Sequence, residues 1–214
     1  MFSIPSETFF HLPQEKRNAI IIAATDEFSR VAYREASINK ITEAAGISRG
    51  SFYQYFSDKK DILFFVFKEY SFSILYGVQK ALRETGGDVF SVSVAFFDET
   101  ALHLQSTESR GLFRNVFMSM HSADIHPHDD INMWELLSNS KKKQIEDFLS
   151  LVDRSRLLKQ SDEDLEDLIF LLGPITKRAI SKVLFSEVNT ESARKTLMDT
   201  LQMVRQGFLQ NGGE

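Results

Sequence analysis

Two short helical stretches on either side of Gly46 constrain the fold of this chain more than any other feature. They lie within residues 37–60, and their apolar residues recur one turn apart, as on the inner face of a helix. The first stretch, about 38–45, stops at the glycine, which can adopt the left-handed conformation of a tight turn. Ser48 is a favourable N-cap for the second stretch, about 49–55. The segment therefore predicts a helix-turn-helix.

The second of these helices has an outward face that suits nucleic acid. Its apolar residues leave cationic, hydroxyl, amide and aromatic groups free, namely Arg49, Gly50, Ser51, Tyr53 and Gln54. A glycine inside a helix costs about 1 kcal/mol relative to alanine, and it is tolerated where another backbone, such as a DNA strand, must come close. The sequence thus predicts a helix that lies in the major groove of DNA.

The net charge of −5 argues weakly against a nucleic-acid binder, but its distribution weakens this objection. Residues 1–70 hold nine Lys/Arg and nine Asp/Glu, so that the acidic excess lies in residues 71–214. Within 37–60 there are four basic and two acidic side chains. Such a local positive face is sufficient for a small DNA contact, because only charges within about one Debye length, ~10 Å, interact strongly.

The rest of the chain also has helical periodicity, and no run of residues alternates as in a strand. With 43% hydrophobic residues and only 4 Pro and 10 Gly in 214 residues, the sequence predicts an all-α fold of about nine helices. Besides the two above, the expected helices span about 14–31, 58–86, 88–105, 109–120, 131–154 and 161–186, and a last helix starts at 189–190 and ends before the glycines at 212–213.

Several function classes are excluded by composition. The absence of cysteine rules out disulfides, thiol catalysis and cysteine zinc sites, and it is compatible with a reducing cytoplasm, where we expect the protein. The first residues do not have the pattern of a signal peptide. The most apolar windows are far shorter than the roughly 20 residues of a membrane span, so no membrane partner is expected.

Residues 46–56, Gly-Ile-Ser-Arg-Gly-Ser-Phe-Tyr-Gln-Tyr-Phe, together with Lys-Lys-Asp-Ile-Leu at 59–63, resemble the TetR/AcrR family of transcriptional regulators. The Ala-Ala-x-x-x-Phe segment of the first helix, from Ala23 to Phe28, is also similar to the family. The resemblance is detailed over about residues 14–76 and continues beyond them only as a number of helices. It implies a DNA-binding domain over residues 1–60 and a larger helical domain for ligand binding and dimerisation over 61–214.

The resemblance assigns roles to individual residues near the turn. Arg49 and Gln54 would read base edges, and Tyr53 and Tyr55 would direct hydroxyl groups to phosphates. Lys59 would bind phosphate at a helix N-terminus. The full set of expected DNA contacts is Ser37, Asn39, Ser48, Arg49, Gly50, Ser51, Tyr53, Gln54, Tyr55 and Lys59.

Two positions depart from the family pattern. Ala32-Tyr33 stands where members usually have Gly-Tyr, so the first helix is expected to end differently. Thr42 stands where they often have alanine, and its hydroxyl needs a partner, for which a backbone carbonyl one turn back is available.

The last two helices carry broad apolar bands that can serve dimerisation. Family members act as homodimers on palindromic operators, and the resemblance implies that these helices form a four-helix bundle with their mates. The expected interface residues are Leu172, Ile175, Ala179, Val183, Leu201, Val204 and Phe208. The same bands can equally pack on the core of their own chain.

Nineteen phenylalanines are a high number for 214 residues, and many lie in the middle helices. They predict an apolar pocket for a flat or greasy effector, lined by Phe67, Tyr70, Phe97, Phe113, Phe117, Trp134 and Phe170. The alternative is that each of these side chains belongs to the core, where phenylalanine is often fully buried.

Residues 121–130 contain three histidines and three aspartates, and a metal ion is the alternative ligand. Their spacing matches no helical ligand pair, so the expectation is no metal and no cofactor. A metal-dependent enzyme or metal sensor using this loop, and a helical adaptor that binds only protein, are the rivals. The sequence favours a ligand-responsive repressor that binds double-stranded DNA as a homodimer and has no enzymatic activity.

Overall fold

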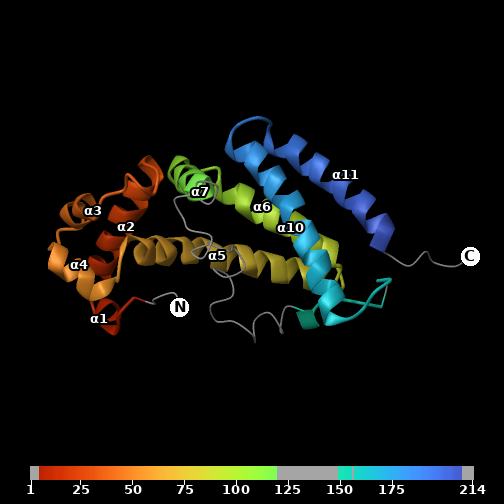
Figure 1. Ribbon diagram of the computed structural model, residues 1–214, viewed down its shortest axis with the longest axis horizontal. Helices are drawn as coiled ribbons and strands as arrows, with labels where there is room; N and C mark the ends of the chain where they lie inside the picture. Colours follow the sequence, from red (N-terminus) through yellow and green to blue (C-terminus); the bar gives the residue numbers. More distant parts are fainter. Residues whose placement is uncertain (1–4, 120–148, 156, 209–214) are drawn as a thin grey trace, which may run out of the picture. The chain divides into compact units, whose positions relative to one another are not determined.

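The computed structural model describes residues 5–119, 149–155 and 157–208, which form helices and no β-strand (Figure 1). The helices are α1 (Glu7–Phe10), α2 (Gln14–Arg30), α3 (Ile38–Ala44), α4 (Arg49–Tyr55), α5 (Lys59–Glu84), α6 (Val89–His103), α7 (Thr107–Ser119), α10 (Asp162–Leu184) and α11 (Thr190–Phe208). The predicted all-α fold is confirmed, and every expected helix in the described residues lies within a few residues of its predicted bounds. The helix expected at 131–154 falls mostly outside them.

One helix was missed by the sequence analysis. The single turn α1 is too short for its periodicity to be recognised, and its formation depends on a distant contact. Its Phe9 is fully buried, with ring centroids 4.9 Å from Phe56 and 5.1 Å from Phe65. Tertiary packing therefore stabilises a helix that local sequence does not predict.

By their contacts, the described residues divide into two compact units. The first holds 5–71 and 104–119, and the second holds 72–103 together with the described part of 149–208. Helix α5 contributes its first half to one unit and its second half to the other. The boundary at residue 60 between DNA-binding and regulatory domains is a functional division and stays a prediction.

The first unit is built around α2, which packs against both α3 and α7. A Cβ atom added to Gly111 of α7 would lie 2.4 Å from the carbonyl oxygen of Ser29, so the two helices cross in close contact. The Asn115 side chain of α7 donates hydrogen bonds to the carbonyls of Phe28 and Ser29, at 2.9 and 3.1 Å. These carbonyls end α2 and have no intrahelical partner, so α7 caps the helix that supports the helix-turn-helix.

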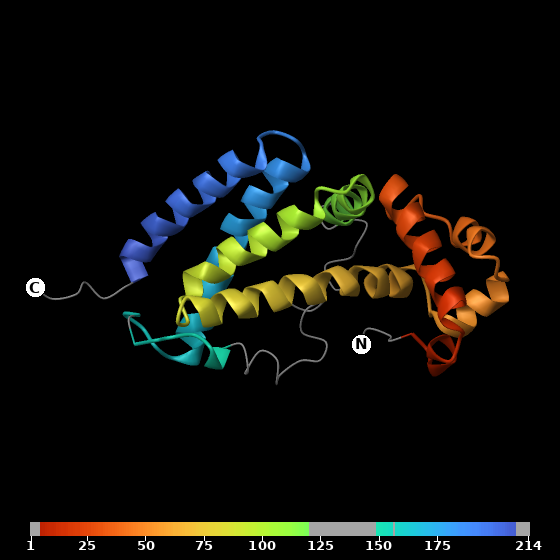
Figure 2. The same ribbon diagram turned by 180° about the vertical axis from the view of Figure 1, so that it is seen from behind.

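The second unit is built around α6, α10 and α11, each of which packs against the other two (Figure 2). Phe97 of α6 is fully buried in it. Arg194 of α11 forms a two-fold hydrogen-bonded ion pair with Asp98 of α6, at 2.7 and 2.9 Å, and Arg205 pairs with Asp88 at 2.7 Å. Apolar burial and these paired charges together fix the register of α11 on α6.

Candidate nucleic-acid interface

The turn between α3 and α4 depends on the left-handed backbone of Gly46, whose φ is +65°. Its N–H donates to the carbonyl of Glu43 at 3.2 Å, and the next N–H, of Ile47, donates to the carbonyl of Thr42 at 3.0 Å. This pair of bonds is the Schellman arrangement that ends a helix. The Thr42 hydroxyl donates to the carbonyl of Asn39 at 2.9 Å, as the sequence analysis predicted.

Helix α4 is fixed at its start and on its inner side. The Ser48 hydroxyl accepts a hydrogen bond from the Ser51 N–H at 3.0 Å, which confirms Ser48 as the N-cap. The two hydroxyls are also hydrogen-bonded to each other at 2.9 Å. Phe52 is fully buried and anchors the helix to the core. These contacts orient α4 so that its opposite face is exposed.

The exposed face of α4 continues onto the start of α3 through Arg49. One guanidinium nitrogen donates to the side-chain oxygen of Asn39 at 2.5 Å, and the other donates to the Tyr53 hydroxyl at 3.2 Å. The guanidinium also lies 5.6 Å from the centre of the Tyr53 ring. Asn39, Arg49, Tyr53 and Gln54 are all exposed, so α3 and α4 together present a polar surface with hydrogen-bonding groups.

Gly50 lies on this face, and no neighbouring atom of the chain would clash with a larger residue at this position. A Cβ atom at this position would meet only the Ser48 hydroxyl, at an ordinary 3.7 Å. The chain itself therefore does not explain why a residue of low helix propensity stands here.

Ser37 precedes α3 but caps it with no side-chain hydrogen bond. Its N–H instead donates to a carboxylate oxygen of Glu27 at 2.9 Å, and the other oxygen of Glu27 accepts from Arg30 at 3.1 Å. Glu27 is only 1% exposed. Sequence reasoning missed this residue, although its spacing from Ala24 and Ala23 places it near the buried side of α2.

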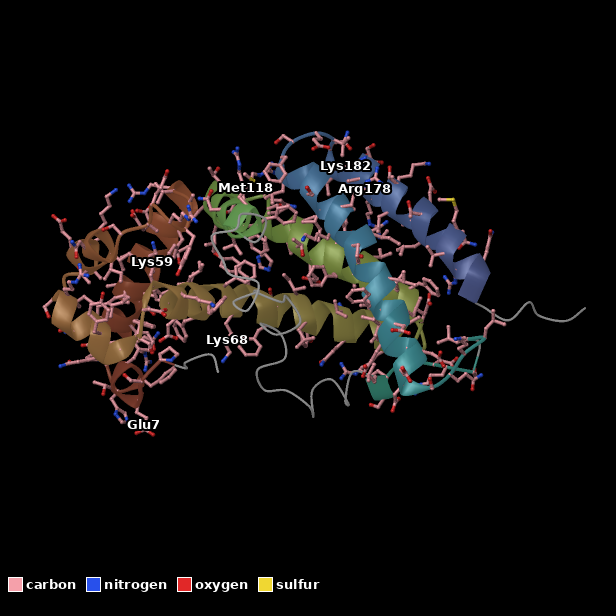
Figure 3. All side chains as sticks on the ribbon, in the orientation of Figure 1. Glu7, Lys59, Lys68, Met118, Arg178 and Lys182 are labelled. Atoms are coloured by element: carbon pink, nitrogen blue, oxygen red, sulfur yellow. The ribbon has the colours of Figure 1, made fainter. Side chains whose placement is uncertain are left out.

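Tyr55 and Lys59, which are predicted to contact phosphates, both have partners within the chain, and the phosphate contacts stay a prediction. Tyr55 is 6% exposed and its ring lies 6.1 Å from that of Phe9, so it is a packing residue. The Lys59 ammonium donates to the carbonyls of Arg34 and Ala36, at 3.1 and 2.8 Å (Figure 3). Burial lowers the pKa of Lys59, and the negative charge of Glu27 acts in the opposite direction.

The N-terminal segment holds the other end of α4. Ser6 donates its N–H to the carbonyl of Tyr55 at 2.9 Å and its hydroxyl to the carbonyl of Gln54 at 2.5 Å. Arg17 of α2 in turn donates to the carbonyl of Phe10 at 2.5 Å. Because the last carbonyls of a helix have no intrahelical partners, Ser6 acts as an external cap for α4.

Three of the predicted pocket residues gather on α5 and α7 in the first unit. Phe67 and Phe113 are buried with ring centroids 5.0 Å apart, and Tyr70 lies edge-on to Phe113 at 5.6 Å. An edge-to-face pair such as that of Tyr70 and Phe113 stabilises packing beyond its buried area. This aromatic cluster is the part of the predicted lining that the structure brings together.

The other predicted pocket residues lie elsewhere. Phe97 belongs to the core of the second unit, Phe117 is half-buried, and Phe170 is 76% exposed. Trp134 lies outside the described residues. Among the described residues, Phe170 is too exposed to line an enclosed cavity, and its place in a pocket stays a prediction.

Most of the predicted dimer residues are buried inside the single chain. The buried ones are Leu172, Ala179, Val183 and Leu201, while Ile175 and Val204 are half-buried. The side chain of Phe208 lies outside what the structure describes. The four buried residues pack within the core of the second unit, and their role in a dimer stays a prediction.

The exposed apolar side chains of α10 and α11 are different ones. They are Phe170 at 76%, Leu171 at 50%, Met198 at 46% and Met203 at 66% exposure. Phe170 and the exposed Pro174 are four residues apart, so they share the side of α10 opposite to Leu172.

The described residues show neither a membrane-spanning helix nor a metal cluster. None of their helices is both long and apolar enough to cross a bilayer. No group of three or more His, Asp or Glu side chains among them could hold a metal ion. The histidine and aspartate loop at 121–130 lies outside this part of the chain.

Two family models match the sequence. The one described as bacterial regulatory proteins, tetR family, matches residues 20–65, which contain α3 and α4. The one described as tetracyclin repressor-like, C-terminal domain, matches residues 88–208, more than half of the chain.

Individual proteins are similar to this chain over part of its length, or over most of it at lower sequence identity. The HTH-type transcriptional activator FasR of Mycolicibacterium smegmatis is 32% identical over 108 residues, 49% of this chain and 48% of that protein. The fatty acid metabolism regulator protein of Bacillus subtilis is 32% identical over 65 residues, 30% of this chain and 34% of that protein. The chain thus aligns with about half or less of these relatives. In fold it is similar to the crystal structure of a TetR family transcriptional regulator from Chloroflexus aurantiacus, with a TM-score of 0.51, 23% identity and coverage of 98% and 100%.

The burial of Phe9 generates a stability prediction with a neighbouring control. Phe9→Ala removes a fully buried ring and is expected to lower the free energy of unfolding by about 3–5 kcal/mol. Phe10→Ala, at a position 44% exposed on the same turn, is expected to lower it by less than about 1 kcal/mol. Urea unfolding followed by circular dichroism measures both, and equal losses would contradict the packing of α1 on α4.

Proposed function

The chain belongs to the TetR family of DNA-binding transcriptional regulators, which are not enzymes, and we propose that it acts as a homodimeric repressor. Two copies occupy a palindromic operator, and a small, largely apolar effector releases them. The observation that carries the proposal is the outward face of α4, where Arg49, Tyr53 and Gln54 are exposed on a helix fixed at both ends.

Base reading is assigned to Arg49 and Gln54. An arginine fork matches the two acceptors of guanine, and a glutamine amide matches the acceptor and donor of adenine. The Tyr53 hydroxyl and Asn39 would contact the flanking backbone, and the exposed Gly50 would let a DNA strand approach α4 closely. The primary role of Ser37, Ser48 and Ser51 is to form hydrogen bonds within the chain at the starts of α3 and α4.

Dimerisation is assigned to the outward side of α10 with α11. One recognition helix reads only a few bases, so two copies about 34 Å apart are needed for a specific site. Phe170 and Leu171 are large apolar side chains that water surrounds in the single chain. Their burial against a second copy would remove the unfavourable exposure of apolar surface to water. The core residues behind them, including Leu172, would support the interface from inside.

The effector is assigned to the aromatic cluster of Phe67, Tyr70 and Phe113 on α5 and α7. Helix α5 begins beside the helix-turn-helix and contains two of these rings. A ligand inserted among them would displace α5, and operator affinity would fall in proportion to the preference of the ligand for the displaced state. A long-chain acyl compound is the first effector to test, because it is apolar and a relative from Bacillus subtilis is named for fatty acid metabolism.

The predicted DNA-reading residues can be tested on a duplex selected from random sequence by the wild-type protein. Gln54→Ala is expected to weaken binding by about 1–3 kcal/mol, roughly 5- to 150-fold, and to relax preference at one base pair per half-site. Gly50→Ala is expected to raise the free energy of unfolding by up to about 1 kcal/mol but to weaken DNA binding. Fluorescence anisotropy measures affinity, and the exposed Gln105→Ala is the control. Unchanged affinity in both α4 variants would refute this use of α4.

Release and regulatory sign are tested together in a transcription assay with the selected operator placed at a promoter. Wild-type protein is expected to lower transcript yield, and oleic acid is expected to restore it while weakening operator affinity at least tenfold. An increase in transcript on protein addition would show an activator, as the Mycolicibacterium smegmatis relative is named. Equal operator affinity with and without bound oleic acid would exclude release by this effector.

The dimer surface is tested by placing a charge on it. Phe170→Glu is expected to raise the dimer dissociation constant at least a hundredfold in sedimentation analysis, because a carboxylate would be buried without a partner. Met118→Glu adds the same charge at an exposed apolar residue of α7, 53% exposed, and is expected to leave the dimer intact. If Phe170→Glu remains dimeric, the interface lies elsewhere.

A further inference from the structure

The outward side of α10 carries charges that are segregated along the helix. Exposed acidic residues occupy its first half, and Glu166 and Asp167 are the ones nearest the middle. Exposed basic residues occupy its second half, where Lys177 and Arg178 are nearest the middle. Figure 3 shows Arg178 toward the end of α10 that leads to α11. The exposed ring of Phe170 lies between the two charged pairs, so the side reads acidic, apolar and basic.

The helix dipole does not explain this segregation. Acidic groups are favourable within the first turn of a helix and basic groups within the last turn, and the effect declines beyond them. Helix α10 spans Asp162–Leu184. The charges at 166–167 and 177–178 therefore lie inside both terminal turns, where the dipole has little influence.

Contacts within the chain do not explain the acidic pair either. In the first turn of α10, Asp164 forms an ion pair with Lys159 at 3.2 Å. In the described part of the chain, no ion pair joins the carboxylate of Glu166 or of Asp167 to a basic group. One turn further along the helix, Asp167 is followed by the apolar Leu171. A partner for these carboxylates has to come from another molecule.

The order of the groups is symmetric about position 172, with the sign of the charge reversed. The pairs at 166–167 and 177–178 lie five and six residues on either side of that position, and Phe170 and the exposed Pro174 lie two residues on either side. A two-fold axis that crosses α10 at this point makes the helices of two copies antiparallel. It brings the acidic pair of each copy opposite the basic pair of the other. The surface is thus complementary to itself, as a symmetric dimer requires.

The two flanks of this side match as well. Residues eleven apart are three turns apart and lie on the same flank of a helix. Glu166 and Lys177 therefore share one flank of the apolar centre, and Asp167 and Arg178 share the other. In an antiparallel pair, Glu166 faces Lys177 of the second copy, and Asp167 faces Arg178 of the second copy. The symmetry repeats both contacts.

We propose that α10 pairs with α10 of a second copy in antiparallel orientation, with the two-fold axis at Leu172, and that these charges select the partner. Charged residues beside an apolar seam set partner choice and orientation in helix pairs. The space beside Gly173 admits the second helix at the axis, since a Cβ atom there would meet no described atom within 4 Å. The inference rests on the proposed homodimer and specifies its register and selectivity.

Reversal of the charges tests the pairing in sedimentation analysis. Glu166→Lys/Asp167→Lys and Lys177→Glu/Arg178→Glu are each expected to raise the dimer dissociation constant about a hundredfold, because like charges then face each other at both ends. Mixed in equal amounts, the two variants are expected to form a heterodimer with a dissociation constant within about tenfold of wild type, because opposite charges meet again. No recovery on mixing would overturn the proposal.

Two comparisons complete this experiment. Glu35→Lys/Glu108→Lys makes the same change of net charge at exposed residues of other elements, and it is expected to leave the dimer unchanged. Wild type mixed with Glu166→Lys/Asp167→Lys is expected to form a heterodimer weaker than the wild-type homodimer, since like charges meet at one end. A parallel pair would bring residue 166 opposite residue 166, so a heterodimer tighter than wild type would contradict the antiparallel orientation.

Cross-linking measures the register directly, because the chain contains no cysteine of its own. Glu166→Cys and Lys177→Cys, distinguished by a size tag, are mixed and treated with a bis-maleimide whose span matches the distance between packed helix axes, about 8–10 Å. Cross-linking between the two variants is expected to exceed that within either one at least tenfold, because the two copies of residue 166 lie about 18 Å apart along the helix axis. Equal cross-linking within one variant would overturn the register.

The homodimer and its register fail in distinguishable ways. Wild-type protein that is monomeric at every concentration would contradict both. A wild-type dimer that shows neither recovery on mixing nor cross-links between the two cysteine variants would overturn the register alone, and the homodimer would then form through another surface.

Discussion

A helix of seven residues is not stable in water by itself, so α4 exists only through the contacts that surround it. The buried ring of Phe52 anchors the middle of α4, and the Ser48 hydroxyl caps its start. Ser6 caps its end by donating a hydrogen bond to the Gln54 carbonyl. At the same end of α4, the ring of Phe9 packs against the ring of Phe56. The first unit therefore supports this short helix. The residues that surround α4 also contact α2, α3 and α5.

The signals that sequence reasoning could use are local ones. Gly46 was recognisable because few residues adopt a positive φ, and Ser48 because a hydroxyl before an amphipathic stretch is the ordinary N-cap. The partners of Ser6, Glu27 and Lys59 lie far away in the chain, with separations of 10 to 48 residues. The periodicity of a sequence does not predict such long-range pairings, so the contacts that support α4 are visible only in the structure.

The apolar band of α10 illustrates a different limit. A band broader than one face predicts that part of it lies in the core and part on the surface, but it does not say which part. Leu172 and Val183 proved to be core, whereas Phe170 and Leu171 are exposed. Periodicity fixes the relative angles of residues around a helix, and only the packing against α6 and α11 fixes which angle points inward.

The external cap of α4 has a consequence for how such a regulator can diversify. Ser6 binds the backbone carbonyls of Gln54 and Tyr55, and Ser48 binds a backbone N–H, so these caps are indifferent to the side chains displayed outward. The atoms that hold the helix and the atoms that face outward from positions 49, 53 and 54 belong to separate sets. If positions 49, 53 and 54 read DNA as proposed, a duplicated gene could therefore acquire a new set of target promoters by substitutions at those positions alone, while the architecture beneath them is inherited unchanged.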